Sequence, residues 1–183
     1  MTVGSTDGEP PGSEPAASTT DAAAADGFRQ AKDVCLRQLA SRPRTREELR
    51  STLVGKGFDT ELVEGVLDRL AAARLVDDAE FAESWVRSRH THQGLGRRAL
   101  RAELLRKGVE AGTAEEALAG LDDTSEEERA RALVRKRLPS LRRVDQTTAL
   151  RRLVALLARK GYPEGVAYTV ASEELGAARE REM

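Results

Sequence analysis

The chain has 183 residues, with 30 basic and 31 acidic side chains and a formal net charge of −1. It contains no run of about 18 apolar residues, the length needed to cross a bilayer, which excludes a membrane-spanning protein. Cys35 is the only cysteine and cannot form a disulfide within the chain, so a reducing, cytoplasmic compartment is expected. Isoleucine is absent and only 3% of the residues are aromatic, whereas Ala, Leu, Arg and Glu are abundant. This composition favours helices over sheets.

The first 27 residues differ in composition from the rest. They are rich in Ala, Pro, Ser and Thr, and up to Asp26 they contain acidic but no basic side chains. Such a segment cannot offset the entropy lost on ordering, so residues 1–27 are predicted to form a disordered acidic tail. Because these acids have no basic counterpart, the rest of the chain carries a net positive charge, which allows anionic partners.

Three helices are predicted directly after this tail. The apolar face of the first consists of Phe28, Ala31, Cys35 and Leu39. Thr45 and Glu48 are spaced as a capping box, which predicts the start of the second helix. Lys56-Gly57 is typical of a helix end, and Asp59 or Thr60 is expected to cap the third helix.

The same layout occurs three times along the chain. Lys107-Gly108 and Lys160-Gly161 repeat the Lys56-Gly57 signal, and a pair of leucines precedes each of the three. Ser125, with Glu128 three residues later, predicts the start of the first helix of the third copy. We therefore expect an all-α protein, an elongated, curved array of three tandem three-helix repeats with about nine helices. The predicted segments are repeats over 28–76, 77–123 and 124–176, followed by a C-terminal tail over 177–183. A four-helix bundle is the competing architecture, but it needs fewer and longer helices.

Basic residues gather in two segments of the second and third repeats. Such clustering indicates a surface for a phosphate backbone or an acidic protein groove, although a solvated helix face with paired charges gives the same pattern. The candidate partner-binding or DNA-binding residues are Arg87, Arg89, Arg97, Arg98, Arg101, Lys107, Arg151, Arg152, Arg159 and Lys160.

No residue pattern of a catalytic, metal or cofactor site stands out. His90 and His92 are two residues apart, so they point to different faces of a helix and are expected on the surface rather than around a metal. Cys35 lies on an apolar stripe and is expected to be a buried small hydrophobe. Gly94-Leu95-Gly96 lacks the Gly-Lys-Ser/Thr ending of a phosphate loop and predicts a turn. We expect no cofactor and no enzymatic activity.

Several ordered motifs resemble the RecX family of regulatory proteins. In the first repeat the resemblance lies in residues 42–49 and in Lys56-Gly57-Phe58. In the second repeat it lies in Leu75-Val76-Asp77-Asp78, Phe81-Ala82, Trp85-Val86, Gly94, Gly96, Arg97, Glu103-Leu104 and Lys107-Gly108-Val109. It covers about residues 30–172 and is weakest in the third repeat.

This resemblance implies a modulator that binds the RecA recombinase in the groove of its filament on DNA. Members of the family inhibit the ATPase, strand-exchange and co-protease activities of RecA. Because they cluster on one predicted helix, Arg97, Arg98 and Arg101 are predicted to face the filament or its DNA. The chain is expected to be monomeric. The alternative is a nonspecific DNA-binding helical protein or a transcriptional regulator, with single- or double-stranded DNA as the partner.

Overall fold

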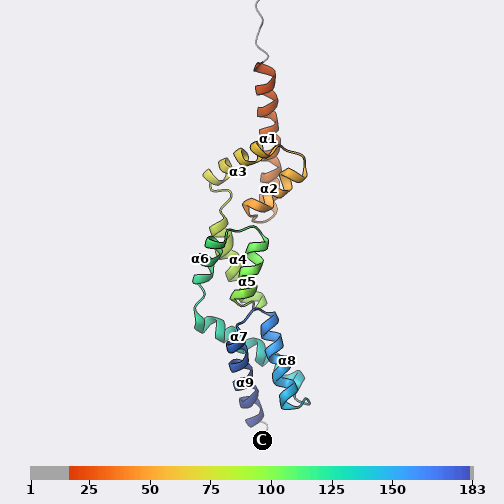
Figure 1. Cartoon of the computed structure of the whole chain (residues 1–183), viewed down its shortest axis with the longest axis vertical. Helices are drawn as coiled ribbons and strands as arrows, with labels where there is room; N and C mark the ends of the chain where they lie inside the picture. Colours follow the sequence, from red (N-terminus) through yellow and green to blue (C-terminus); the bar gives the residue numbers. More distant parts are fainter. Residues whose placement is uncertain (1–16, 182–183) are drawn as a thin grey trace, which may run out of the picture.

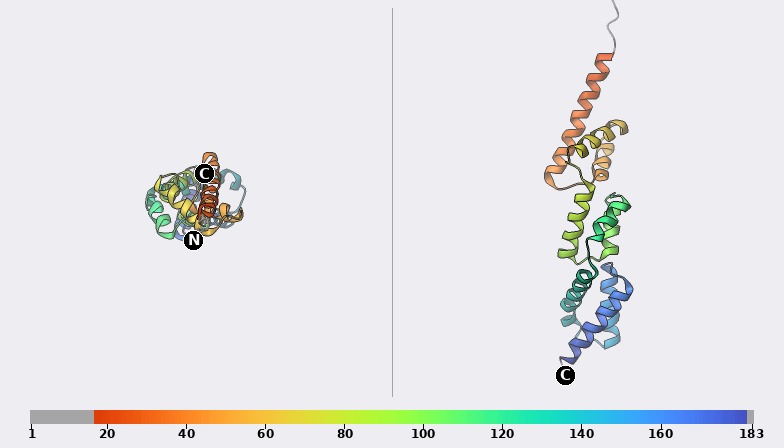
Figure 2. Two further views of the ribbon diagram at one scale, coloured as in Figure 1. Left: turned by 90° about the horizontal axis from the view of Figure 1, so that it is seen from above. Right: turned by 90° about the vertical axis from the view of Figure 1, so that its left-hand side faces the viewer.

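Nine α-helices and one short 3-10 helix make up residues 17–181, the part of the chain that the computed structural model describes, and no strand occurs among them. The helices form three groups of three that follow one another along the long axis of the molecule (Figure 1). The side view in Figure 2 gives the same order, and the view from above superimposes the groups. The predicted elongated all-α array of three three-helix repeats is confirmed. We call the groups the first, second and third units.

The first unit consists of α1 (Ala17–Ser41), α2 (Arg46–Gly55) and α3 (Thr60–Ala72). The predicted capping box is present at α2, where the Thr45 side chain accepts from the Glu48 amide and the Glu48 carboxylate accepts from the Thr45 amide. The core of the first unit consists of Ala31, Cys35, Leu49, Leu53, Val63, Val66, Leu67, Leu70 and Val76. Cys35 is fully buried, as predicted, and burial raises the pKa of its thiol.

The second unit consists of α4 (Asp78–Gln93), α5 (Arg97–Arg106) and α6 (Ala111–Ala119). Asp77 caps α4 through its side chain, and Gly94 ends this helix with a left-handed backbone. The core consists of Phe81, Ala82, Val86, Leu95, Leu100, Leu104, Val109, Ala114, Ala117, Leu118 and Leu121, with Trp85 packed against it.

The third unit consists of α7 (Asp123–Arg137), the 3-10 helix η1 (Leu138–Leu141), α8 (Gln146–Arg159) and α9 (Glu164–Glu180). Its core consists of Ala130, Val134, Leu141, Ala149, Leu153, Leu157, Tyr162, Ala167, Val170, Ala171 and Leu175. The most extensive contacts between helices all lie within a unit. This is expected of a repeat array whose units each have a small core of their own.

The start of α7 differs from the prediction. Asp122, rather than Ser125, is the N-cap residue, and its carboxylate accepts from the Ser125 amide at 2.5 Å. Asp is as good a cap as Ser, so the helix begins at the first competent residue and leaves Ser125 inside its first turn.

Both ends of the helical array extend past the predicted boundaries. Helix α1 begins at Ala17, ahead of the boundary expected at residue 27, and α9 continues to Glu180 rather than ending at 176. Adding alanine-rich residues to an existing helix needs no new nucleation, which explains the extension over residues 17–27. The remainder of the two predicted tails, residues 1–16 and 182–183, lies outside the described residues. No helix within the described range is long and apolar enough to cross a bilayer.

His90 is buried, which contradicts the prediction that both histidines lie on the surface. The left-handed turn at Gly94 brings the carbonyl oxygen of Leu95 to 2.9 Å from His90 Nδ1, so the ring has a polar partner inside the second unit. His92 is exposed, as predicted.

Candidate partner-binding surface

Each unit after the first docks its Lys-Gly turn on the start of the preceding unit's middle helix; α2, α5 and α8 are the middle helices. At the first junction the Thr45 hydroxyl donates to the carbonyl oxygen of Lys107 at 2.6 Å. The ammonium of Lys107 lies 2.9 Å from Glu48 Oε1. The turn sits so close that a methyl group at Gly108 would overlap the side chain of Glu47.

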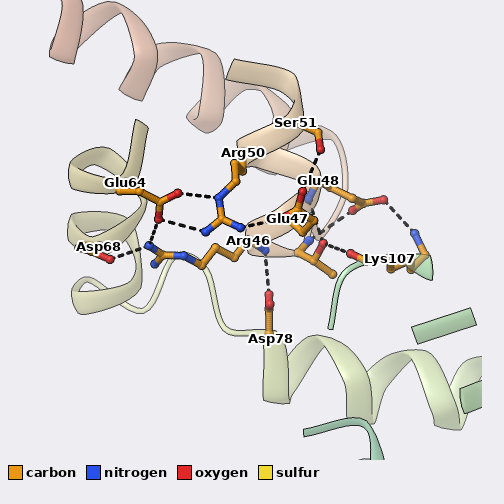
Figure 3. A network of polar contacts seen from close by, with 10 residues as sticks. Arg46, Glu47, Glu48, Arg50, Ser51, Glu64, Asp68, Asp78 and Lys107 are labelled. Atoms are coloured by element: carbon orange, nitrogen blue, oxygen red, sulfur yellow. Dashed lines mark hydrogen bonds and ion pairs between the residues drawn. The ribbon is translucent and has the colours of Figure 1, made fainter. Parts of the chain in front are cut away.

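A carboxylate of the second unit completes this junction. Asp78, at the start of α4, accepts from the Arg46 amide at 2.8 Å (Figure 3). Burial raises the pKa of Asp78, although the hydrogen bond from Arg46 opposes the shift. Burial also disfavours the charged form of Glu48, but the hydrogen bonds from Lys107 and the Thr45 amide prevail and lower the pKa of its carboxyl. The amides at the start of α2 are thus met by oxygen atoms of Thr45 and Glu48 in the first unit and of Asp78 in the second.

An ion-pair network stands beside this junction on the outer face of the first unit. Arg46 lies 2.7 Å from both Glu64 and Asp68, which project from α3 (Figure 3). Arg50 contacts the same Glu64 at 2.6 Å and Glu47 at 2.5 Å. The hydrogen bonds from Arg50 and Arg46 lower the pKa of Glu64 to about 2. These two arginines bind α2 to α3 and are already occupied by acids of their own unit.

The second junction repeats the first with backbone donors. The amides of Gly96 and Arg98, at the start of α5, donate to the carbonyl oxygens of Lys160 and Gly161 at 2.8 and 3.3 Å. The Lys160 ammonium donates to the Gln93 carbonyl at 2.8 Å. A methyl group at Gly161 would overlap the backbone of Ala99.

Arg97 forms hydrogen bonds and ion pairs across the second junction. Its amide donates to Glu126 Oε1 at 2.9 Å and its Nε to Glu126 Oε2 at 3.1 Å. Its guanidinium also reaches Asp123 at 3.0 Å and the Leu121 carbonyl. Arg97 therefore corresponds to Arg46 in the first junction, since the amide that opens the middle helix meets a carboxylate of the next unit in both cases.

Two cationic side chains pack against the aromatic ring of Trp85. Arg89 lies 4.1 Å and Lys107 lies 4.3 Å from the ring centroid. The indole N–H donates to Glu103 at 2.9 Å, and Arg89 approaches the same carboxylate at 3.6 Å. Trp85 is thus a residue at the edge of the core whose indole N–H has a hydrogen-bond partner.

The ten predicted partner-binding residues divide into two sets. One set is engaged within the chain: Arg89, Arg97, Arg101 (paired with Glu115), Lys107 and Lys160. The other set is exposed and forms no ion pair within the described residues: Arg87, Arg98, Arg151, Arg152 and Arg159. The partner-binding role of both sets stays a prediction.

Four of the exposed arginines lie on consecutive middle helices, and we call them the basic row: Arg98, Arg151, Arg152 and Arg159. The hydrogen bond from the Arg98 amide to Gly161 brings the start of α5 against the end of α8, where Arg159 lies. Arg152 and Arg159 are seven residues apart and so share a face of α8. Among residues 17–181, no acid forms an ion pair with a guanidinium group of the basic row.

The regions of the chain that match known protein families coincide with the three units. The family models for the first, second and third three-helix domains of RecX match residues 31–70, 77–118 and 125–170. The regulatory protein RecX of Amycolatopsis mediterranei (strain U-32) is 60% identical over 148 residues, which cover 81% of this chain and 85% of that protein. RecX of Thermobifida fusca (strain YX) is 45% identical over 171 residues, covering 93% and 88%.

Solved structures agree with the architecture. The crystal structure of RecX from Lactobacillus salivarius matches with a TM-score of 0.76 at 23% identity, over 82% of this chain and 97% of that one. A second crystal structure, of a regulatory protein RecX, also has a TM-score of 0.76, at 25% identity over 88% of this chain and 80% of that one. With three family domains in order and relatives of 45–60% identity, the chain belongs to the RecX family of regulatory proteins.

Proposed function

We propose that this protein binds the filament of the RecA recombinase and inhibits its ATPase, strand-exchange and co-protease activities. The observation that carries the proposal is the match of all three RecX domains, in order, over most of the chain. In this proposal the protein acts as a monomer in the cytoplasm, without a cofactor, and has no catalytic activity of its own.

The shape of the molecule supports binding to a polymer. The three units are joined by hydrogen bonds, ion pairs and close backbone approach, so each unit has a defined position relative to the next. A rod of this kind can touch several subunits of a filament at once. Weak contacts made together by linked units give a much higher total affinity than each contact alone.

The basic row supports an anionic or acidic partner surface. Its arginines lie on consecutive units and carry charge that no acid within the described residues neutralises by an ion pair. Arginine suits both phosphate and carboxylate groups because its planar fork binds either in a bidentate manner. The row is therefore compatible with acidic side chains of the filament and with its DNA.

The test is the rate of ATP hydrolysis by the cognate RecA on single-stranded DNA with this protein titrated in. We expect inhibition at amounts well below those of RecA, at a salt concentration where the protein alone does not bind DNA. Unchanged hydrolysis would contradict the proposal. Inhibition that disappears on adding competitor single-stranded DNA would also contradict it, because sequestration of DNA then explains the effect.

Direct DNA binding is the second candidate function, and the basic row is the observation that favours it. Binding that depends on phosphate contacts weakens steeply as salt rises, because counterions released from DNA drive it. A gel-shift titration of the protein on DNA at low and at physiological salt separates the two functions. Retention of tight binding to RecA filaments at a salt concentration that abolishes binding to bare DNA would favour the filament.

A further inference from the structure

The Lys-Gly turn occurs three times in the chain, and within residues 17–181 two of the three copies are covered by another unit. Gly57, Gly108 and Gly161 share a left-handed backbone, with φ of 85°, 78° and 88°. In each copy the glycine amide and the following amide donate back to the last turn of the middle helix. The three turns therefore share one backbone conformation. A surface that is complementary to the backbone of one turn is complementary to that of the other two.

The two covered copies define what such a turn binds. In both, the carbonyl oxygen of the lysine accepts from a donor at the start of a helix, Thr45 Oγ1 or the Gly96 amide. In both, the lysine ammonium is bonded to an oxygen of the docked unit, the Glu48 carboxylate or the Gln93 carbonyl. In both, the glycine lies against the second or third residue of the docked helix, Glu47 or Ala99. The common ligand is the N-terminal turn of an α-helix together with an oxygen that accepts from the lysine.

The first copy has the same groups, and no other segment of the described chain covers it. Lys56 and Gly57 are exposed, and a methyl group at Gly57 would meet no atom within 4 Å. Within residues 17–181, the Lys56 ammonium forms no ion pair or hydrogen bond, in contrast to Lys107 and Lys160. Shallow hollows of about 430 and 290 Å³ flank the turn; Arg37 and Lys56 line both, and Asp33 also lines the larger one. The open turn thus presents a carbonyl acceptor, close access at the glycine and two cations.

We propose that the Lys56-Gly57 turn is a docking surface for the N-terminal turn of an α-helix in the RecA protomer at the end of the bound rod, with an acidic side chain of that turn paired to Lys56 and Arg37. The inference rests on the proposed function for the identity of the partner. Its chemistry comes from the two internal junctions, which bind the same kind of helix start through the same groups.

Charge argues against a second copy of this chain as the occupant. The corresponding uncovered helix start is that of α8, capped by its own Asp145, whose carboxylate accepts from the Thr148 amide at 2.9 Å. Asp145 is the only acid of the sequence between Arg129 and Pro163, and four arginines flank it: Arg142, Arg143, Arg151 and Arg152. Docking this end against Lys56 and Arg37 would bring like charges together, which opposes head-to-tail association.

The first test reverses the charge of the turn. The probe is the RecA filament assembled on single-stranded DNA with a non-hydrolysable ATP analogue, and the readout is the dissociation constant of the full chain. Lys56→Glu is expected to weaken binding about tenfold or more, because the substitution places like charges face to face. Lys32→Glu is the matched control, since Lys32 is exposed on α1 of the same unit, and it is expected to stay within about twofold of the wild type.

The second test blocks the turn sterically without changing its charge. Gly57→Asn is tolerated in the free chain, because asparagine adopts the left-handed backbone and the site is open, but it prevents the close approach that both internal junctions use. Weakened filament binding by both Lys56→Glu and Gly57→Asn, with an unchanged melting temperature, supports the docking surface. Wild-type affinity of both variants overturns it while leaving the proposed function intact.

Two further outcomes have distinct meanings. If the wild type itself fails to bind the filament, the proposed function and the inference that rests on it both fall. If sedimentation shows that the wild type self-associates and Lys56→Glu abolishes this, the occupant is a second copy and the inference is overturned.

Discussion

The hydroxyl of Thr45 joins two units of the rod, since it donates to the carbonyl oxygen of Lys107 at 2.6 Å across 62 residues of sequence. The same oxygen accepts from the Glu48 amide at 3.1 Å and so caps α2. A single buried hydroxyl therefore starts one helix and binds the end of another. Local helix stability and the junction between units are coupled at this residue.

Replacing Thr45 with Ala is expected to lower the free energy of unfolding by about 1–3 kcal/mol. The change removes an N-cap and leaves the partly buried carbonyl of Lys107 without that donor, and both losses are of this order. Urea denaturation measures it. Thr45→Ser keeps the hydroxyl and serves as the control, with an expected loss of less than about 1 kcal/mol. Equal losses for the two variants would show that the hydroxyl is not the source of the stability.

Gly57 and Gly161 form a matched pair that separates backbone strain from junction packing. Both have a left-handed backbone, but only Gly161 lies against another unit. Gly57→Ala is expected to lower the free energy of unfolding of the isolated chain by about 1 kcal/mol, the strain of an L-residue at positive φ. Gly161→Ala is expected to cost about 1–3 kcal/mol more, because its methyl group overlaps the backbone of Ala99. If urea denaturation gave similar losses of unfolding free energy for the two variants, the second junction would be able to accommodate the extra methyl group without loss of stability.

Much of the fold follows from local sequence signals. Thr45 with Glu48 caps α2 as predicted, and Asp59, one of the two predicted candidates, caps α3, because a cap depends on residues only two or three positions away. The leucines before each Lys-Gly turn are buried in all three units, as their equivalent positions predict. Their repetition alone is enough to indicate three similar units.

The junctions could not be predicted in the same way. The acids that meet Arg46 and Arg97 are Asp78 and Glu126, which lie 32 and 29 residues further along the chain, and no local pattern identifies such partners. Clustering placed Arg97 among the exposed cations, although its side chain is bonded within the chain. The burial of His90 depends on a carbonyl that the turn at Gly94 redirects. These contacts become visible only when the units are stacked.

Neighbouring Arg97 and Arg98 are expected to differ sharply in their contribution to stability. Arg97→Ala removes the guanidinium that pairs with the buried Glu126 carboxylate, whose remaining partner in the second unit is the backbone amide of residue 97. We expect the free energy of unfolding to fall by about 2–3 kcal/mol. This is less than for a fully buried ion pair, because the Arg97 side chain is partly exposed. Arg98→Ala removes an exposed side chain and should change the free energy of unfolding by less than about 0.5 kcal/mol. Urea denaturation of both variants checks this difference, and equal values would contradict it.

Glu64 gives the first unit a specific pH dependence. Hydrogen bonds from Arg50 and Arg46 lower the pKa of its carboxyl from 4.5 to about 2, so its contribution to stability is fully present above pH 4.5 and is lost as the pH falls towards 2. Because the side chain is 36% exposed, the contribution is expected to be below about 1 kcal/mol.

The measurement compares Glu64→Gln with the wild type by urea denaturation from pH 7 to pH 3. We expect a constant difference down to about pH 4.5 and a shrinking one below it. Glu61→Gln, at an exposed position of α3, is the control for the loss of a carboxylate from this helix. A difference that grows on acidification would mean that the carboxylate is destabilising in the folded chain.

The arginines of α8 offer the sharpest test of the basic row. We expect the triple variant Arg151→Ala, Arg152→Ala, Arg159→Ala to fold with wild-type stability, because these side chains are exposed and form no ion pair within residues 17–181. If the row binds carboxylates or phosphates of the filament, as proposed, the affinity for RecA filaments should fall about tenfold, because three guanidinium groups are lost. Fluorescence anisotropy at two salt concentrations provides the measurement.

The matched control carries the same charge change on exposed cations elsewhere: Lys32→Ala, Lys136→Ala, Arg137→Ala. Its affinity should stay close to that of the wild type if position, rather than net charge, determines binding. The salt dependence then identifies the ligand. If the row contacts DNA phosphates, the slope of log K against log salt should fall by about one for each arginine removed, whereas contacts to acidic side chains of the protein change the slope much less. Equal affinity of the triple variant and the control would remove the basic row from the binding surface.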